Sequence, residues 1–398
     1  LKRVIVEPLA FVYFAGFALF YETSNSAIYF KACAQAGYGP DICANLNDFP
    51  ELEDKIQATT SDWMTYYSAS FSLLACVTNI FLSAWGDMVG RKINMLLGII
   101  GTSIYAFSFV LVSAMPSLPL WIIIPVGVAT SLTGAHGLIL GSMIMYTIDI
   151  THNEDELTIR LSLLSAVWSF GYVVGSYLSA SLLQHLSFPN TMVCGQALMA
   201  AAMIYVWIFV KQKPPGHVGS EQPEMEKPTE PDTVTTPEDS INNSDIKKTS
   251  PANKPSHTGE VVRTVRQLLR DLMATMAKKR GNHHRLYMLI VILAFFIYIT
   301  IDQGTSGTTS NFLKRRPLHF GPSAVSLYQS VTSFVQMLGS ICSSLLLKRL
   351  GWSDLSIALI SMLSAVAKML LLGLSGKPFM VLVSSGRWEK VFLDHFFA

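Results

Sequence analysis

Residues 82–92 read Leu82-Ser83-Ala84-Trp85-Gly86-Asp87-Met88-Val89-Gly90-Arg91-Lys92 and form a short polar stretch between two long apolar runs, 63–85 and 93–114. About 20 apolar residues suffice for an α-helix to cross the hydrocarbon core of a bilayer. Gly90 permits the positive φ of a tight turn, and Asp87 can accept hydrogen bonds from Arg91 and from a nearby helix N-terminus. The stretch therefore predicts a turn between two antiparallel membrane helices. Arg91 and Lys92 have a simpler alternative explanation, since cations are enriched in cytoplasmic loops.

The composition extends this prediction to the whole chain. Of its 398 residues, 51% are hydrophobic and 14% are charged, whereas soluble domains contain about 25% charged residues. The formal net charge of +2 gives no bulk attraction to polyanions. These values exclude a disordered chain and a nucleic-acid-binding protein. They predict an all-α multi-pass protein of the lipid bilayer.

Nine apolar runs are long enough to span the bilayer. With the N-terminus in the cytoplasm, the cytoplasmic segments contain 20 Lys and Arg residues and the outer segments contain 6, which include Lys314. This asymmetry places the N-terminus and the longest loop in the cytoplasm. The predicted spans are 5–30, 63–85, 93–114, 118–148, 161–183, 190–211, 286–304, 323–347 and 355–376.

The polarity divides the chain into five regions. Residues 1–211 contain six spans, and 212–258, rich in Pro, Glu, Thr and Ser, predict a disordered cytoplasmic linker. Residues 259–284 alternate apolar and basic positions at helical spacing, which is typical of an amphipathic helix on the inner leaflet; a calmodulin-type target is the alternative. Residues 285–383 contain spans 7–9 and the start of a tenth, and 384–398 form an atypical tail of mixed polarity.

The D-x-x-G-R-[RK] loop after the second span resembles the loop motif of the major facilitator superfamily. This resemblance implies two six-helix halves joined by a long cytoplasmic linker, here a six-helix first half and about three helices of the second. It implies that Gly86, Asp87, Gly90, Arg91 and Lys92 form a gating loop, in which Asp87 and Arg91 latch the cytoplasmic ends of the two halves.

Further stretches resemble one branch of that superfamily, solute carrier family 46, the proton-coupled folate transporter group. They are Val6-Glu7-Pro8, Trp63, residues 84–92, 149–151, 160–164, 295–304 and Lys377-Pro378-Phe379-Met380. The resemblance implies secondary active transport of a small organic solute, an organic anion such as folate or another metabolite, by alternating access and with proton coupling. It ends near Met380, so we expect a C-terminally truncated chain. Folate itself is an unsafe expectation, because three titratable positions of the family fall at Ala135, Ser165 and Asp302.

Three ionisable residues inside predicted spans are candidates for the solute or proton pathway: Glu22, His136 and Asp302. Ionisable groups in membrane spans are costly and mark pathways by default. They fall on spans 1, 4 and 7, which line the central cavity in the superfamily. Each residue also has an explanation without a role in transport. Glu22 could lie near a wet outer interface, and His136 could be a packing residue among Thr133, Gly134 and Gly137. Asp302 could simply end its apolar run.

Other polar residues give weaker signals. Asp149 and Arg160 could brace the loop between spans 4 and 5, or form an ordinary surface ion pair. Cys33 and Cys43 could form a disulfide if the first outer loop faces an oxidising space. Lys368, in span 9, is expected to pair with a neighbour or to snorkel.

No metal-ligand motif, nucleophile motif or phosphate-binding loop occurs in the sequence, so we expect neither an enzyme nor a resident cofactor or metal. The alternatives to a transporter are a non-transporting membrane receptor or regulator on a carrier scaffold, and an inactive truncated isoform. Plasma membrane and lysosomal membrane are both open as locations, and the sequence does not specify the oligomeric state.

Overall fold

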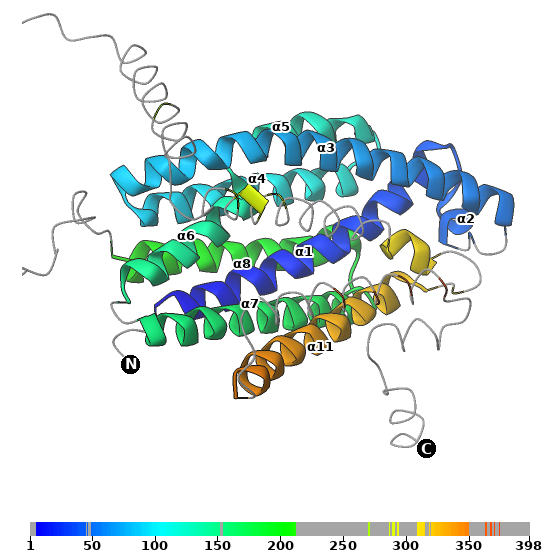
Figure 1. Cartoon of the computed structure of the whole chain (residues 1–398). Helices are drawn as coiled ribbons and strands as arrows, with labels where there is room; N and C mark the ends of the chain where they lie inside the picture. The colour runs from blue at the N-terminus through cyan, green and yellow to red at the C-terminus, as the bar shows by residue number, and fades with distance from the viewer. Residues whose placement is uncertain are drawn as a thin grey trace, which may run out of the picture. The chain divides into compact units, whose positions relative to one another are not determined.

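The computed structural model describes residues 5–44, 49–151, 154–211, 309–314 and 320–349, together with single residues 46, 270, 286, 289, 290, 293, 318, 363, 367, 370 and 374. Within this part of the chain every regular element is a helix (Figure 1). Internal contacts divide the chain into two units, Leu1–Lys213 with Leu289–Ala398, and Pro214–Met288. The predicted linker, interfacial helix, spans 7 and 9 and tail lie outside the described residues, apart from single positions.

The first helix, α1 (Val6–Gln35), is the central helix of the first unit. It packs most extensively against α7 (Glu154–Leu182) and α8 (Phe188–Phe209), and it also contacts α3 and α4. Twenty-two of its 30 residues are buried, and a helix buried on every side shows no amphipathic stripe. Its buried side chains contribute to both of the large apolar clusters of the first 211 residues.

The third helix, α3 (Pro50–Val89), begins 13 residues before the predicted span 63–85 and follows the short α2 (Pro40–Ala44). Pro50 occupies the first turn, where its missing N–H costs nothing, and Glu51 and Glu53 favour the positive end of the helix dipole. Glu53 is buried and accepts a hydrogen bond from Gln57, one turn later. Residues 50–62, which lie outside the predicted spans, are therefore helical, because they combine a favourable helix start with packing against the protein.

The predicted span 118–148 is interrupted in the structure. It consists of a 3₁₀ turn, η2 (Leu120–Ile122), and two helices, α5 (Ile123–Leu132) and α6 (Ala135–Asp149). Gly134 lies in the left-handed region at φ +68° and Ala135 at φ +38°. This backbone cannot continue a right-handed helix, and glycine adopts it at little cost. The other helices are α4 (Arg91–Ala114) and α11 (Pro322–Arg349).

Five helical stretches among the described residues are long and apolar enough to cross a membrane: Pro50–Asp87, Arg91–Ala114, Leu120–Asp149, Ile159–Leu182 and Phe188–Phe209. Helix α11 matches the predicted span 323–347 to within two residues at each end, and α1 begins with the predicted span 5–30 but extends five residues beyond it. Neither helix is among the five. In α1 the polar run Glu22-Thr23-Ser24-Asn25-Ser26 lowers the mean hydropathy. All five of these residues are buried by the protein, so this helix does not depend on lipid contact at that level.

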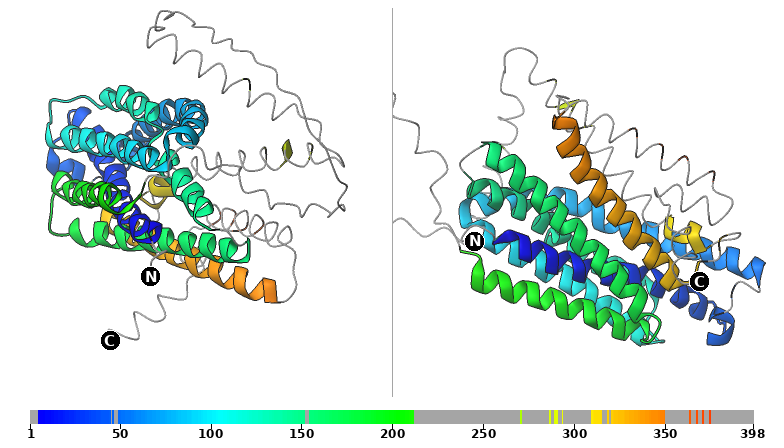
Figure 2. Two further views of the ribbon diagram at one scale, coloured as in Figure 1. Left: turned by 90° about the vertical axis from the view of Figure 1, so that its left-hand side faces the viewer. Right: turned by 90° about the horizontal axis from the view of Figure 1, so that it is seen from below.

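Helix α7 lies between α1 and α11 (Figures 1 and 2). Its glycines allow a very close approach to α1. A Cβ on Gly175 would lie 2.2 Å from the Ala15 carbonyl oxygen, and one on Gly171 would lie 2.6 Å from that of Phe11. Small residues at a helix interface let the two backbones approach in this way.

Replacing Gly175 with alanine should therefore push α7 away from α1. We expect the Gly175→Ala variant to lose about 1–3 kcal/mol of stability, as is usual when atoms are inserted into a packed interior. The measurement is the midpoint of thermal unfolding in detergent micelles.

The matched control is Gly141→Ala in α6, because no atom lies within 4 Å of a Cβ built there. Alanine is the better helix former, so this control should unfold at the same temperature as the wild type or higher. Equal midpoints for the two variants would contradict the close packing of α1 and α7.

Candidate functional site

Glu22 lies on the central helix and is 1% exposed. Its Oε1 accepts a hydrogen bond from the Tyr172 hydroxyl of α7 at 3.1 Å. Its Oε2 has no hydrogen-bond partner among the described residues. Lys314, from the helical segment 309–314, interacts with Glu22 electrostatically. The structure therefore does not place Glu22 at a wet interface, which was the alternative for this residue.

Hydroxyl groups join the helices next to Glu22. Thr23 of α1 and Ser179 of α7 share a hydrogen bond of 3.0 Å, and Ser179 shares another of 3.3 Å with Ser326 of α11. Ser323 and Ser330 of α11 donate to the carbonyl oxygens of Ala180 and Val173 in α7. These bonds connect the described part of the second half to the first half beside the buried carboxyl.

His136 lies in the first turn of α6, directly after the interruption at Gly134. Its ring stacks on Phe17 of α1 with centroids 4.2 Å apart, and its Nδ1 is 3.3 Å from the Tyr13 hydroxyl, which also shares a 3.0 Å hydrogen bond with Thr102 of α4. Phe14 adds an edge contact at 5.3 Å. His136 thus has aromatic packing and a polar partner on the central helix. It contacts Tyr13–Phe17, roughly 8–13 Å along α1 from Glu22 at 1.5 Å per residue.

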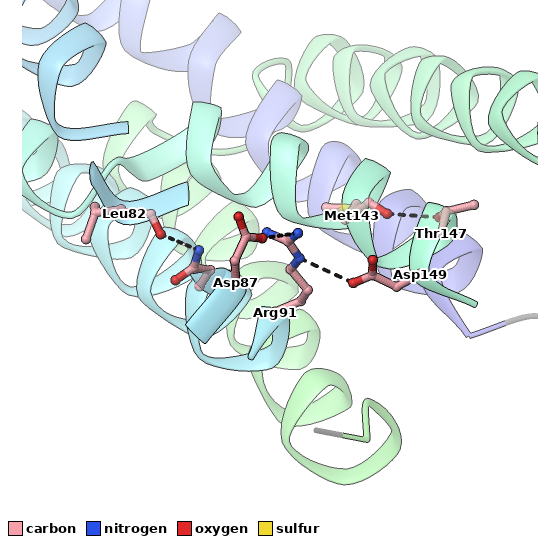
Figure 3. A network of polar contacts seen from close by, with 7 residues as sticks. Leu82, Asp87, Arg91, Met143, Thr147 and Asp149 are labelled. Atoms are coloured by element: carbon pink, nitrogen blue, oxygen red, sulfur yellow. Dashed lines mark hydrogen bonds and ion pairs between the residues drawn. The ribbon is translucent and has the colours of Figure 1, made fainter. Parts of the chain in front are cut away.

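The turn at residues 86–92 is held by contacts within the first half (Figure 3). Gly90 separates α3 from α4 at φ +113°, a conformation that favours glycine. The Asn94 side chain donates to the Leu82 carbonyl oxygen at 2.7 Å and lies so close to Gly86 that a Cβ there would be 2.0 Å from its Nδ2.

The charged residues of this turn reach two other helices. Arg91 forms ion pairs with Asp87 and, from its Nε, with Asp149 Oδ2 at the end of α6 at 3.4 Å. Lys92 donates to the Trp207 carbonyl oxygen of α8 at 2.8 Å and lies over the Trp207 ring. The turn therefore ties α3 and α4 to α6 and α8. The expected latch to the second half falls on residues outside the described part of the chain and stays a prediction.

Asp149 and Arg160, expected to brace the loop between them, each have other partners. Asp149 pairs with Arg91. Arg160 donates to Thr151 Oγ1 at 3.1 Å and forms an ion pair with Glu156 at 3.4 Å. Thr151 is two residues beyond Asp149, so Arg160 contacts the start of that loop. A direct contact between Asp149 and Arg160 remains a prediction.

Cys33 and Cys43 form a disulfide that joins the last turn of α1 to α2, with Cα atoms 5.8 Å apart. At the same end of α1, Lys31 donates to the carbonyl oxygens of Met115 and Pro116. Gln35 donates to the Leu118 carbonyl oxygen and accepts from the Leu120 N–H. These bonds fix the turn after α4. Asp302 and Lys368 lie outside the described residues.

The sequence analysis missed three polar residues around the candidate positions: Tyr13, Tyr172 and Lys314. Lys314 was counted as an outer loop charge, but it is 6% exposed. The four-residue spacing of Ser310 and Lys314 on a helical turn was the available signal. The two tyrosines resembled packing residues, and only the fold brings their hydroxyls to His136 and Glu22. Among the described residues, no group of three or more His, Cys, Asp or Glu side chains could hold a metal ion.

The family model of the Major Facilitator Superfamily matches residues 11–387. The chain belongs to this superfamily of membrane transporters. The expected superfamily is thus confirmed, together with its helical membrane fold. The match includes the turn at residues 86–92 and the helices that carry Glu22 and His136.

Curated relatives agree with the expected branch. The chain is 24% identical to the proton-coupled folate transporter of Bos taurus over 211 residues. This alignment covers 52% of this chain and 45% of that protein. It is 24% identical over 221 residues to the lysosomal proton-coupled steroid conjugate and bile acid symporter SLC46A3 of Gallus gallus, over 53% of this chain and 47% of that protein. The match to the folate transporter of Rattus norvegicus is also 24%. The chain spans about half the length of these relatives.

The contacts of Arg91 give a testable coupling. Each of its ion pairs is partly exposed, so each should contribute less than about 1 kcal/mol. We expect Arg91→Gln to cost about 1 kcal/mol in total, with a smaller loss at high salt. The measurement is a double-mutant cycle with Asp149→Asn, read as unfolding midpoints in detergent.

In this cycle Asp149→Asn should cost less in the Arg91→Gln background than in the wild type. Lys55→Gln, which removes an exposed cation on α3, is the control and should leave the cost of Asp149→Asn unchanged. The same cost of Asp149→Asn in all three backgrounds would refute the contribution of the pair.

Proposed function

We propose that the chain carries a small organic solute across the bilayer by alternating access and that proton movement drives this transport. Membership of a transporter superfamily supports the first part. The relatives named as proton-coupled transporters support the second. Because the chain spans about half of their length, the solute and the coupling are proposed for it and not transferred from them.

The observation that carries the proposal is the burial of Glu22 on the central helix. Burying a carboxyl group is costly unless it is neutral or its charge is compensated. Here one oxygen accepts from Tyr172, the other has no described hydrogen-bond partner, and Lys314 is a positive group that interacts with the carboxyl electrostatically. A titratable group in this position changes the local charge balance whenever it binds or releases a proton.

His136 and Asp302 are the other members of the proposed pathway. His136 touches the same central helix through Tyr13 and Phe17, so its protonation would act on a helix shared with Glu22. Asp302 belongs to predicted span 7 and is proposed on its sequence position alone. Spans 1, 4 and 7 would then carry one titratable group each.

Orientation and location follow from the sequence in this proposal. We place the N-terminus and the long linker in the cytoplasm, because cations are concentrated in these segments. The Cys33–Cys43 disulfide would then lie on the outer side or in the lumen, where disulfides persist. The names of the relatives supply the probes: folate, a steroid conjugate and a bile acid.

Uptake into proteoliposomes with an imposed proton gradient tests the function. Tritiated folate, estrone sulfate and taurocholate serve as substrates, at about pH 5.5 and about pH 7.5 outside. We expect wild-type uptake of at least one of them to be faster in acid. The Glu22→Gln variant should take it up equally at both pH values, because its side chain no longer titrates.

Glu51→Gln is the matched control, since Glu51 is an exposed acid near the start of α3, and it should keep the acid stimulation. Asp302→Asn should lose it while folding normally. Acid-stimulated uptake that survives in Glu22→Gln would remove Glu22 from the mechanism. Binding of a probe without any wild-type flux would favour a receptor or regulator over a transporter.

A further inference from the structure

Three buried polar side chains project from one helical turn of the second half, residues 309–314. Ser310 is 1% exposed, Asn311 is 7% exposed and Lys314 is 6% exposed. Ser310 Oγ, Asn311 Oδ1 and Lys314 Nζ have no hydrogen-bond partner among the described residues. Buried polar groups nearly always have partners, so three such atoms on one turn require an explanation.

The turn itself is held firmly against the first half. Asn311 uses its Nδ2 to donate to Ser61 Oγ of α3 at 2.8 Å, and the same nitrogen lies 3.8 Å from Met64 Sδ. Lys314 Nζ lies 5.3 Å from the centroid of the Tyr29 ring on α1, at the distance of a cation–π contact. Two of the three residues with unpartnered atoms, Asn311 and Lys314, are therefore positioned by contacts with α3 and α1.

The charges around Lys314 come from α1 and α3. Glu22 of α1 interacts with it electrostatically, and the titratable group beside Glu22 on α7 is Tyr172. Glu53 of α3 interacts electrostatically with the hydroxyl of Tyr29, whose ring lies beneath the Lys314 ammonium. Residues 322–339 of α11 contain no charged side chain. Glu22 is thus a counter-charge for Lys314, yet the Lys314 ammonium has no hydrogen-bond partner among the described residues.

We propose that Lys314 binds the anionic group of the transported solute, a carboxylate or a sulfate ester. The ammonium donates to the anion, and the Ser310 hydroxyl is a second donor on the same turn. Asn311 Oδ1 remains as an acceptor for a hydroxyl or amide N–H of the solute. This inference rests on the proposed transport function and assigns the recognition of its anionic solute to one residue.

The arrangement also links the anion to a proton. With the site empty, the negative charge that balances Lys314 is that of Glu22. When a solute anion binds Lys314, Glu22 takes up one proton from the water of the open side and becomes a neutral carboxylic acid. The net charge of the buried group is then the same before and after binding, so one anionic charge enters with one proton.

Ligand-dependent stabilisation of the purified full chain in detergent tests the binding site without requiring transport. The probes are estrone sulfate, its neutral parent estrone, and folate, titrated at acidic and neutral pH while the unfolding midpoint is recorded. We expect at least one anion to stabilise the wild type, more strongly in acid, and estrone to stabilise it less than estrone sulfate. Lys314→Gln should weaken the apparent affinity for the anion at least ~tenfold, as the loss of a charge-assisted hydrogen bond does.

Lys314→Arg should retain most of the affinity, and Lys55→Gln, the exposed-cation control, should retain all of it. Glu22→Gln should bind the anion equally well at both pH values. A purely structural role for Lys314 would lower the unfolding midpoint without changing the ligand-induced shift, and this result would overturn the inference. Absence of anion stabilisation in the wild type would also overturn it.

The two proposals fail in different ways. Wild-type flux with an unchanged anion affinity in Lys314→Gln would leave the transporter proposal standing and reject the site. Lys314-dependent anion binding without flux in proteoliposomes would retain the site and reject transport.

Discussion

The burial of the polar middle of α1 is the constraint on which the rest of the described structure depends. The stretch of α1 that contains Glu22, Thr23 and Asn25 cannot face lipid, because unpaired polar groups in hydrocarbon are costly. It must be enclosed by other helices. Helix α7 packs closely on the part of α1 that precedes this stretch, since Gly171 and Gly175 carry no side chains where they meet the carbonyl oxygens of Phe11 and Ala15. The hydroxyl bonds from Thr23 through Ser179 to Ser326 follow from this proximity.

Two groups of contacts have different physical characters. Around the turn at residues 86–92, exposed or partly exposed charges connect helices of the first half, and salt weakens such pairs. Around Glu22 and Lys314, the charged side chains are buried, where salt screens them much less than at the surface. In the proposed mechanism, solute and proton binding are assigned to the second group, whereas the contacts of the first group connect the helix ends.

The fold was predictable to a large extent, because apolar runs of membrane length and one specific turn identify the superfamily without any contact information. The bounds of α11 and the start of α1 agree with the predicted runs for this reason, whereas α1 continues five residues past the predicted end. Hydropathy could not predict that α3 starts at Pro50, since residues 50–62 are mostly polar; their helix rests on Pro50 and the acids of the first turn and on packing, as the burial of Glu53 illustrates. It also could not predict the interruption at Gly134, because an apolar window averages over one glycine.

The candidate site was predictable only in part. Glu22 and His136 stand out in the sequence as ionisable residues in apolar runs, and the structure gives each a specific set of neighbours. The helices that enclose a polar residue decide whether it belongs to a buried site or to an exposed loop. Lys314 is enclosed by contacts with residues nearly 300 positions earlier in the chain, such as Tyr29. Tyr172 resembles any aromatic packing residue until α7 brings its hydroxyl to Glu22.

The interruption between α5 and α6 has a mechanical consequence. A continuous helix tilts as one unit along its whole length, whereas the break at Gly134–Ala135 separates two short helices. Helix α5 packs mainly on α3, and α6 packs mainly on α4. If the bundle rearranges, each helix would tilt with its own neighbour, and the imidazole of His136, one residue past the break, would move with α6.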